Sequence, residues 1–263
     1  MLDGKKTAKK IREQLKNKIK KNQLKPGLAV ILIGKDLGSL IYVKLKQSAA
    51  EQLGINFKLL SFSATVSQQK IINSIKKINR DKNFHGLIVQ MPLPKKFDPD
   101  TLVENIAAEK DVDGFGSKTK FISPVYQAIL KLMVQCQKTF KNKKAVILGK
   151  NPVFTLPLKN IFEKMGLITE VINLKNLKVD KVKKADFLVV ALGSPNFIKS
   201  SMIKKNAVII DVGYNRIKGK SVGDIDLGVH LKTPYLSPVP GGIGPLTVAY
   251  LLKNVYLATK IIH

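Results

Sequence analysis

The segment Lys144-Ala145-Val146-Ile147-Leu148-Gly149 is an apolar run that ends at a glycine, and a helical pattern over residues 154–165 follows it. Further apolar runs at 167–173, 187–191 and 207–211 predict strands. Strands that alternate with helical patterns are typical of a parallel sheet with crossover helices. A strand, a glycine turn and a helix in this order also form the place where a Rossmann domain binds a pyrophosphate, with unpaired N–H groups at the helix start.

The glycine turn alone does not identify a ligand. It has no G-x-G-x-x-G motif, and many α/β proteins have such a junction with nothing bound there. Glu170 lies near the spacing at which an acidic side chain binds a ribose, but it falls inside the predicted strand, so we assign it no role.

The same alternation precedes this segment. Apolar runs at 27–34, 55–62 and 86–90 predict strands, and helical patterns cover 39–53 and 66–79. This β-α-β-α-β order predicts a second parallel sheet in the N-terminal half of the chain.

Three more helical patterns cover residues 8–22, about 124–138 and about 246–262. The last of them presents one apolar side, made of Val248, Leu251, Leu252, Val255 and Ala258 or Thr259. A polar, lysine-rich stretch at 139–144 separates the two α/β halves. We therefore predict an α/β fold with a first domain over 1–138 and a second, Rossmann-type domain over 139–245.

The composition of the 263 residues is that of a globular protein, with 44% hydrophobic and 24% charged residues. No apolar run is long enough for a membrane helix and the N-terminus does not resemble a signal peptide, so we expect a soluble cytoplasmic protein. The single Cys136 predicts a buried or partly buried structural thiol. We infer no metal site.

The net charge of +28 raises the alternative of a nucleic-acid-binding protein. Only three of the 46 basic residues are arginines, and the lysines are spread along the whole chain. Base readout and bidentate phosphate contacts favour arginine. A solvated lysine surface is therefore the favoured interpretation, and we expect no specific nucleic-acid partner.

Several residues could form a small-molecule site. Tyr42 and Lys46 are four residues apart and share one helix face, and Gln90 ends a predicted strand. Asp113 belongs to a tight acidic turn, although each of these residues has an ordinary structural explanation. The loop at 237–245, with its three prolines and three glycines, presents bare peptide groups before a helix and fits the wall of a ligand site.

Motifs along nearly the whole chain resemble one enzyme family, methylenetetrahydrofolate dehydrogenase/methenyltetrahydrofolate cyclohydrolase. The order and spacing of the motifs agree with the family's and are highly specific. They are Ser39-Leu40-Ile41-Tyr42-Val43-Lys44-Leu45-Lys46, Gly86-Leu87-Ile88-Val89-Gln90-Met91-Pro92-Leu93-Pro94, Glu109-Lys110-Asp111-Val112-Asp113-Gly114, Asp211-Val212-Gly213-Tyr214-Asn215, Val222-Gly223-Asp224 and the loop at 238–247.

The resemblance implies two α/β domains with the active site in a cleft between them, a last helix (246–263) that returns to the first domain, and a homodimer. It implies oxidation of 5,10-methylenetetrahydrofolate with NADP, or with NAD, and hydrolysis of the methenyl product to 10-formyltetrahydrofolate. The implied residues fall into three groups. They are Lys46, Gln90 and Asp113 as catalytic residues, Tyr42, Pro240, Gly241 and Gly242 as folate-binding residues, and Gly149, Lys150, Asn151 and Tyr214 as cofactor-binding residues.

The cofactor half departs from the family pattern. The usual Gly-Arg-Ser-x-x-Val-Gly-x-Pro turn has Lys150, Asn151, Phe154 and Thr155 in place of its Arg, Ser, Val and second Gly. The usual His-Ser-x-Thr is Asn173-Leu174-Lys175-Asn176. Two alternatives follow. Either the enzyme is bifunctional and uses Lys150 and Lys175 for the phosphate, or it is a cyclohydrolase whose dehydrogenase activity is weakened or lost.

Overall fold

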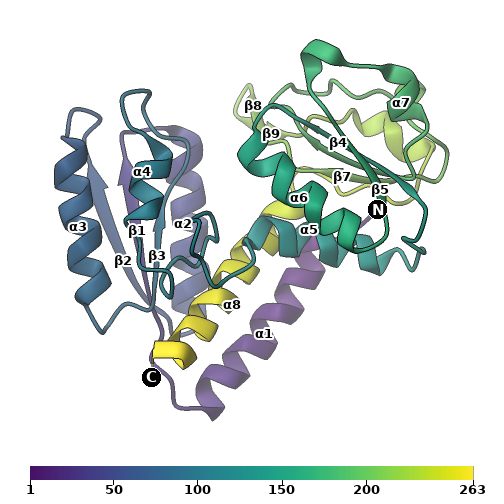
Figure 1. Cartoon of the computed structure of the whole chain (residues 1–263). Coiled ribbons are helices and arrows are strands. Elements are labelled where there is room, and N and C mark those ends of the chain that lie inside the picture. The colour runs from purple at the N-terminus through teal and green to yellow at the C-terminus, as the bar shows by residue number, and fades with distance from the viewer. Residues whose placement is uncertain (263) are drawn as a thin grey trace. The chain divides into compact units, whose positions relative to one another are not determined.

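A computed structural model describes residues 1–262, and its chain divides into two compact units (Figure 1). The N-terminal unit comprises residues 8–127 and 247–262, and the Rossmann unit comprises 1–7 and 128–246. Residue 263, the last of the predicted C-terminal segment, lies outside the described residues.

The N-terminal unit is built on a three-stranded parallel sheet in the order β2-β1-β3, with strands β1 (Gly27–Ile33), β2 (Asn56–Phe62) and β3 (Gly86–Val89). Every residue of β1 is buried, as expected for a central parallel strand covered on both faces. Six helices contribute residues to this unit. They are α1 (Gly4–Lys21), α2 (Leu37–Gln52), α3 (Gln68–Arg80), α4 (Pro99–Glu104), α5 (Pro124–Gln135) and α8 (Ile243–Ile262).

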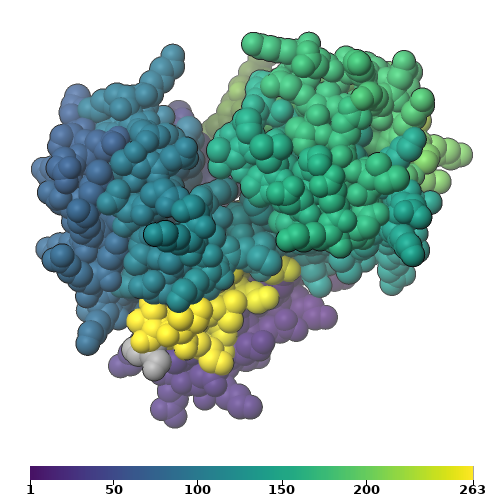
Figure 2. All heavy atoms as spheres, viewed as in Figure 1, coloured from purple at the N-terminus to yellow at the C-terminus, as the bar shows by residue number. Residues whose placement is uncertain are grey.

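The C-terminal helix packs into the core of the N-terminal unit, which confirms the predicted return of the chain. Its buried Val248, Leu251 and Val255 share a cluster with Leu28 and Val30 of β1. The yellow α8 lies against the purple α1 in both the ribbon and the space-filling views (Figures 1 and 2). At their contact the Asn22 amide donates to the hydroxyl of Tyr256 at 2.8 Å.

The Rossmann unit has a four-stranded parallel sheet in the order β5-β4-β6-β7. Because the chain runs from β4 outward to β5 and then back to the other side, the strand order reverses between β4 and β6. In open α/β sheets, ligands bind at such a reversal, at the carboxyl ends of the strands. The elements of this unit are β4 (Lys144–Gly149), α6 (Pro152–Lys164), β5 (Ile168–Ile172), α7 (Val179–Lys183), β6 (Phe187–Ala191), β7 (Val208–Asp211), β8 (Asn215–Ile217) and β9 (Lys220–Val222).

The predicted strands and long helices are confirmed, while α4, α7 and the β8–β9 hairpin are not predicted by the sequence. These three pieces are three to six residues long, too short to show a period. Cys136 is buried, as predicted. No helix within residues 1–262 has the length and apolar character that crossing a membrane requires.

The compact units divide the chain at a different place from the predicted boundary at 139. The division falls inside α5, after residue 127, and residues 1–7 lie with the Rossmann unit. Backbone hydrogen bonds explain why residues 1–7 lie with the Rossmann unit. Leu2 N donates to Leu236 O at 2.9 Å, and Lys5 N donates to Gly241 O at 3.0 Å.

Candidate active site

Helix α2 carries two of the candidate residues. Asp36 caps the helix by accepting a hydrogen bond from Ser39 N at 2.7 Å, which fixes where the helix begins. Tyr42 and Lys46 follow one helical turn apart, so that both side chains leave the same face of α2. Tyr42 is half-buried, whereas Lys46 is only 7% exposed.

The buried Lys46 is held by Gln90, which directly follows β3. Lys46 Nζ donates to Gln90 Oε1 at 2.8 Å. The backbone N–H of Gln90 donates to Ile31 O at 2.8 Å and continues the sheet, while its Nε2 donates to Met91 O at 2.6 Å. The two side-chain hydrogen bonds fix the amide so that its oxygen faces the lysine. The structure thus brings together two residues that lie 44 positions apart.

Asp113 belongs to a loop that is fixed on both sides. Before it, the buried Asp111 carboxylate accepts hydrogen bonds from Gly114 N at 3.1 Å and Gly116 N at 2.8 Å. The amide of Asn254 on α8 donates to Val112 O at 2.9 Å and to Ile122 O at 3.0 Å. Asp113 therefore has a defined position relative to the sheet.

The pKa values of Lys46 and Asp113 are both shifted in the direction that favours the neutral form of the side chain. Burial lowers the pKa of Lys46 below its ordinary value, and the charge of Asp113 partly opposes this shift. Burial raises the pKa of Asp113; the charge of Lys46 opposes this effect and that of Asp111 adds to it. A lysine in this setting loses its proton more readily than a solvated one, which is the property that proton transfer near neutral pH requires.

The other predicted folate-binding residues belong to the Rossmann unit. Pro240 is exposed, while Gly241 and Gly242 are buried. Gly242 N donates to Pro238 O at 2.7 Å, which closes the loop ahead of α8. Gly241 has a φ of +114°, a conformation that favours glycine.

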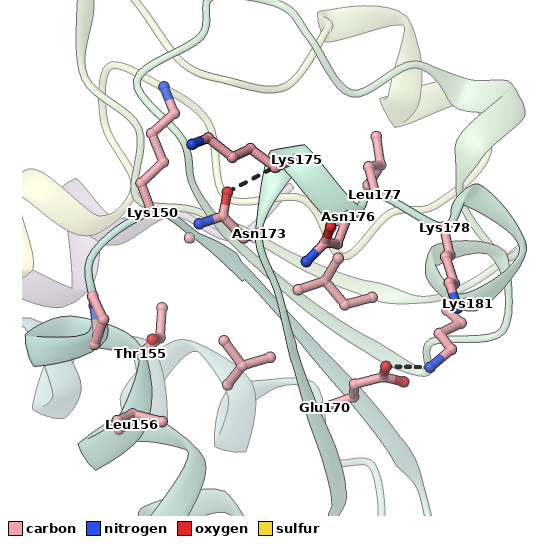
Figure 3. Close-up of a pocket in the computed structure, with 14 residues that line it drawn as sticks. Lys150, Thr155, Leu156, Glu170, Asn173, Lys175, Asn176, Leu177, Lys178 and Lys181 are labelled. Carbon is pink, nitrogen blue, oxygen red and sulfur yellow. Dashed lines mark hydrogen bonds and ion pairs between the residues drawn. The ribbon is translucent and has the colours of Figure 1, made fainter.

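A cavity of about 750 Å³ lies at the carboxyl ends of β4 and β5, within the size range of cofactor sites (Figure 3). Gly149 and Lys150 line it from the β4 turn, and Lys175 lines it from the segment after β5. Gly149 cannot carry a side chain, because a Cβ there would lie 2.5 Å from the methyl group of Thr155.

The start of α6 differs from the expectation of unpaired N–H groups. Pro152 has no N–H, and Asn151 Oδ1 accepts from Val153 N at 2.9 Å. The N–H groups of Phe154 and Thr155 donate to Asn151 O at 3.1 and 3.0 Å. Asn151 therefore caps the helix, and the lysine side chains are the positively charged groups that can bind an anion in this cavity.

The charges around the cavity are predominantly positive. Glu170 lies in the middle of β5 and forms an ion pair with Lys181 (Figure 3). The carboxylate is thereby neutralised within the cavity wall. Tyr214 is half-buried outside the set of residues that line this cavity, and its hydroxyl accepts a hydrogen bond from Ser221 Oγ at 3.1 Å.

Several residues of these sites were not predicted by the sequence. Lys178 and Lys181 line the cavity, yet the chain contains so many lysines that none of them stands out. Asn254 lies outside the predicted apolar side of the C-terminal helix, so the periodicity did not indicate that its side chain is buried. Asp224 is also buried, and its motif gave no role for its carboxylate.

Comparison with known proteins first defines the class. Residues 2–113 match the family model "Tetrahydrofolate dehydrogenase/cyclohydrolase, catalytic domain". Residues 123–263 match the model "Tetrahydrofolate dehydrogenase/cyclohydrolase, NAD(P)-binding domain". The α/β class with a Rossmann-type second sheet agrees with both matches.

Full-length relatives are similar to the whole chain. The Bifunctional protein FolD of Bacillus licheniformis is 38% identical over 99% of this chain and 97% of the relative. The crystal structure of the FolD enzyme from Campylobacter jejuni superposes with a TM-score of 0.93 at 34% identity, covering 99% of this chain and 98% of that one. The Trypanosoma brucei enzyme, solved with NADP and an inhibitor, also has a TM-score of 0.93, at 27% identity, covering 99% of this chain and 97% of that one. The chain belongs to the tetrahydrofolate dehydrogenase/cyclohydrolase family.

Proposed function

We propose that this enzyme oxidises 5,10-methylenetetrahydrofolate with NADP and hydrolyses the methenyl product to 10-formyltetrahydrofolate. The observation that carries the proposal is the buried Lys46 ammonium, 2.8 Å from Gln90 Oε1 and in the field of Asp113. A lysine held in this way supports proton transfer, and an acidic side chain nearby supports recognition of the N–H groups of a pterin.

The hydrolysis needs a group that accepts a proton near neutral pH. The oxygen of a water molecule bonds to the methenyl carbon, and Lys46 takes one of its protons. The bond from that carbon to one ring nitrogen then breaks, the nitrogen gains a proton and the carbonyl of the formyl group forms. Overall one water is consumed and one proton is released. Gln90 keeps Lys46 Nζ in place without adding charge.

The remaining folate contacts follow from the resemblance. We assign the pterin N–H groups to Asp113 and the aminobenzoyl ring to Tyr42, which leaves the same face of α2 as Lys46. On the resemblance alone, we also assign Pro240, Gly241 and Gly242 to folate binding.

The cavity at β4 and β5 fits a dinucleotide phosphate. Its lysines complement a dianionic phosphate, and the pairing of Glu170 with Lys181 removes a repulsive charge. We assign the phosphate that distinguishes NADP from NAD to Lys150 and Lys175, while Gly149 and Asn151 shape the turn between β4 and α6. On the resemblance alone, we also assign Tyr214 to cofactor binding. The cofactor, when bound, accepts the hydride of the oxidation. This positive cavity favours the bifunctional enzyme over a cyclohydrolase without dehydrogenase activity.

The matches of both halves of the chain to enzyme domains favour this function over nucleic-acid binding. We further propose a cytoplasmic protein, as the sequence predicts, and a homodimer, as the resemblance implies. Light scattering of the purified protein then gives twice the chain mass of 29.1 kDa. A particle of one chain mass would contradict the homodimer and leave the proposed activity standing.

Replacement of Lys46 by Met tests the catalytic assignment. The variant keeps an unbranched apolar side chain in the buried position but has no proton acceptor. We expect hydrolysis of supplied methenyltetrahydrofolate to be abolished, with the thermal transition of the folded protein preserved. Substantial remaining turnover would show that another group transfers the proton.

A further inference from the structure

Two buried carboxylates lie behind the carboxyl edge of the Rossmann sheet. Asp211 ends β7 and is 2% exposed, and Asp224 follows β9 and is fully buried. The chain leaves room for Asp224 at Gly213, where a Cβ would come within 2.2 Å of the Asp224 carboxyl carbon. A buried charge is costly unless hydrogen bonds satisfy it, so its partners indicate what the carboxylate stabilises.

The Asp224 carboxylate accepts hydrogen bonds from three consecutive backbone N–H groups. Leu192 N and Gly193 N donate to Oδ2 at 2.5 and 3.0 Å, and Ser194 N donates to Oδ1 at 2.7 Å. Successive N–H groups that converge in this way form an anion-binding concavity. In this protein the anion is supplied by the chain itself.

This loop, residues 192–194, continues β6 at the place where the strand order of the sheet reverses. Ala191 at the end of β6 is paired with Gly149 at the end of β4. The loop and the Gly149 turn are therefore the two adjacent strand ends that flank the reversal, where α/β sheets bind their ligands. The lysine cavity covers the β4–β5 side, so the 192–194 loop belongs to the other half of the site.

We propose that Asp224 is a positioning residue for the dinucleotide, a role that rests on the proposed function. Its carboxylate holds the N–H groups of the 192–194 loop away from the ligand and fixes the path of the backbone. The loop then contacts the nicotinamide half of the dinucleotide through groups other than these three N–H groups. The phosphates interact with the lysine cavity instead, because the concavity that could have bound one of them is already filled.

Two residues, Asp211 and Asn215, hold Asp224 in place through three hydrogen bonds. The backbone N–H groups of Asp224 and Ile225 donate to the carboxylate of Asp211 at 3.2 and 3.0 Å. Asn215 Nδ2 donates to Asp224 Oδ1 at 2.9 Å. Burial raises the pKa of Asp211 to about 7, although its backbone hydrogen bonds oppose this shift. Each contact anchors the carboxylate that organises the loop.

The test compares Asp224→Asn with the wild-type enzyme. Asparagine has the same shape, but its NH₂ group cannot accept from an N–H, so one end of the concavity becomes repulsive. Titration of NADPH by its fluorescence gives Kd without turnover. We expect Kd to rise about tenfold, with hydrolysis of supplied methenyltetrahydrofolate, a step that needs no cofactor, within about twofold of wild type.

Asp186→Asn is the matched control. Asp186 also accepts a backbone hydrogen bond, from Lys144 N at 2.9 Å, but at the amino edge of the same sheet. We expect this variant to bind NADPH as the wild type does. An unchanged Kd in folded Asp224→Asn, or an equal rise in the control, would overturn the positioning role.

A second variant covers the case in which Asp224→Asn does not fold. Asn215→Ala removes one contact of Asp224 and keeps its carboxylate, and we expect a rise in Kd of about threefold. An unchanged Kd in this variant would also count against the proposal. A wild-type protein that binds neither NADPH nor NADH would instead refute the proposed dehydrogenase function, so the two failures are distinguishable.

Discussion

At the scale of single residues, the chemistry depends on how Lys46 is solvated. The chain carries many solvated lysines, whereas Lys46 is 7% exposed and has a defined partner in Gln90. Burial lowers its pKa and Asp113 partly restores it. This balance gives Lys46 a reactivity that solvated lysines do not have.

Replacing Gln90 by Glu tests this balance. The new carboxylate lies next to Lys46 Nζ and stabilises its charged form, so the pKa of Lys46 rises. Because hydrolysis needs the neutral amine, we expect the pH–rate profile to move to higher pH by about one unit or more. Gln90→Met, which removes the hydrogen bond without adding charge, is the control. A profile that stays in place in Gln90→Glu would mean that Lys46 does not titrate in the rate-determining step.

At the scale of elements, α8 stabilises the loop that carries Asp113. Asn254 donates to two carbonyl groups, and Gln127 Nε2 donates to Asn254 Oδ1 at 3.0 Å. All three hydrogen bonds are made between residues of the N-terminal unit. A helix at the end of the chain thus fixes a loop near its middle.

Asn254→Leu removes these hydrogen bonds and fills a similar volume. We expect the KM for the folate substrate to rise about threefold to tenfold, because Asp113 loses its fixed position, while the Kd for NADPH stays unchanged. The control is Tyr256→Phe on the same helix, which removes only the hydrogen bond from Asn22. Equal folate KM values in the two variants, at comparable thermal stability, would mean that Asn254 does not position Asp113 and only stabilises the fold.

The elements also show what sequence can and cannot predict. Regular alternation of apolar runs and helical patterns identified both sheets, and the resemblance paired Lys46 with Gln90. The contact between Asn254 and the Asp113 loop requires knowing how α8 packs against residues more than a hundred positions away. The role of Asp224 depends on which strand ends are adjacent, and no local pattern encodes that register. Asn151 caps α6 at the position where the family motif has Ser, and both residue types are common helix caps, so the satisfied N–H groups at the start of α6 could have been predicted.

At the scale of the whole molecule, the net charge of +28 affects how anionic ligands approach. A positive field raises the local concentration of anions and is screened by salt. NADP carries one phosphate more than NAD, so its interaction with the protein depends more on this field. The charge therefore bears on cofactor preference even where a lysine contacts no ligand.

Salt dependence of the cofactor KM measures this effect. Between about 20 mM and about 300 mM sodium chloride we expect the KM for NADP to rise several-fold, and that for NAD to rise less. In the double variant Lys150→Gln, Lys175→Gln, we expect the KM values for NADP and NAD to depend equally on salt. If the two KM values already depended equally on salt in the wild type, this would argue against a lysine-bound phosphate.

The central claim is that one chain performs both the oxidation and the hydrolysis. The most direct measurement is a spectroscopic assay of purified protein with 5,10-methylenetetrahydrofolate and either NADP or NAD. We predict reduction of NADP together with formation of 10-formyltetrahydrofolate. The absence of cofactor reduction with both dinucleotides at saturating concentration, with hydrolysis of supplied methenyltetrahydrofolate intact, would contradict the bifunctional assignment.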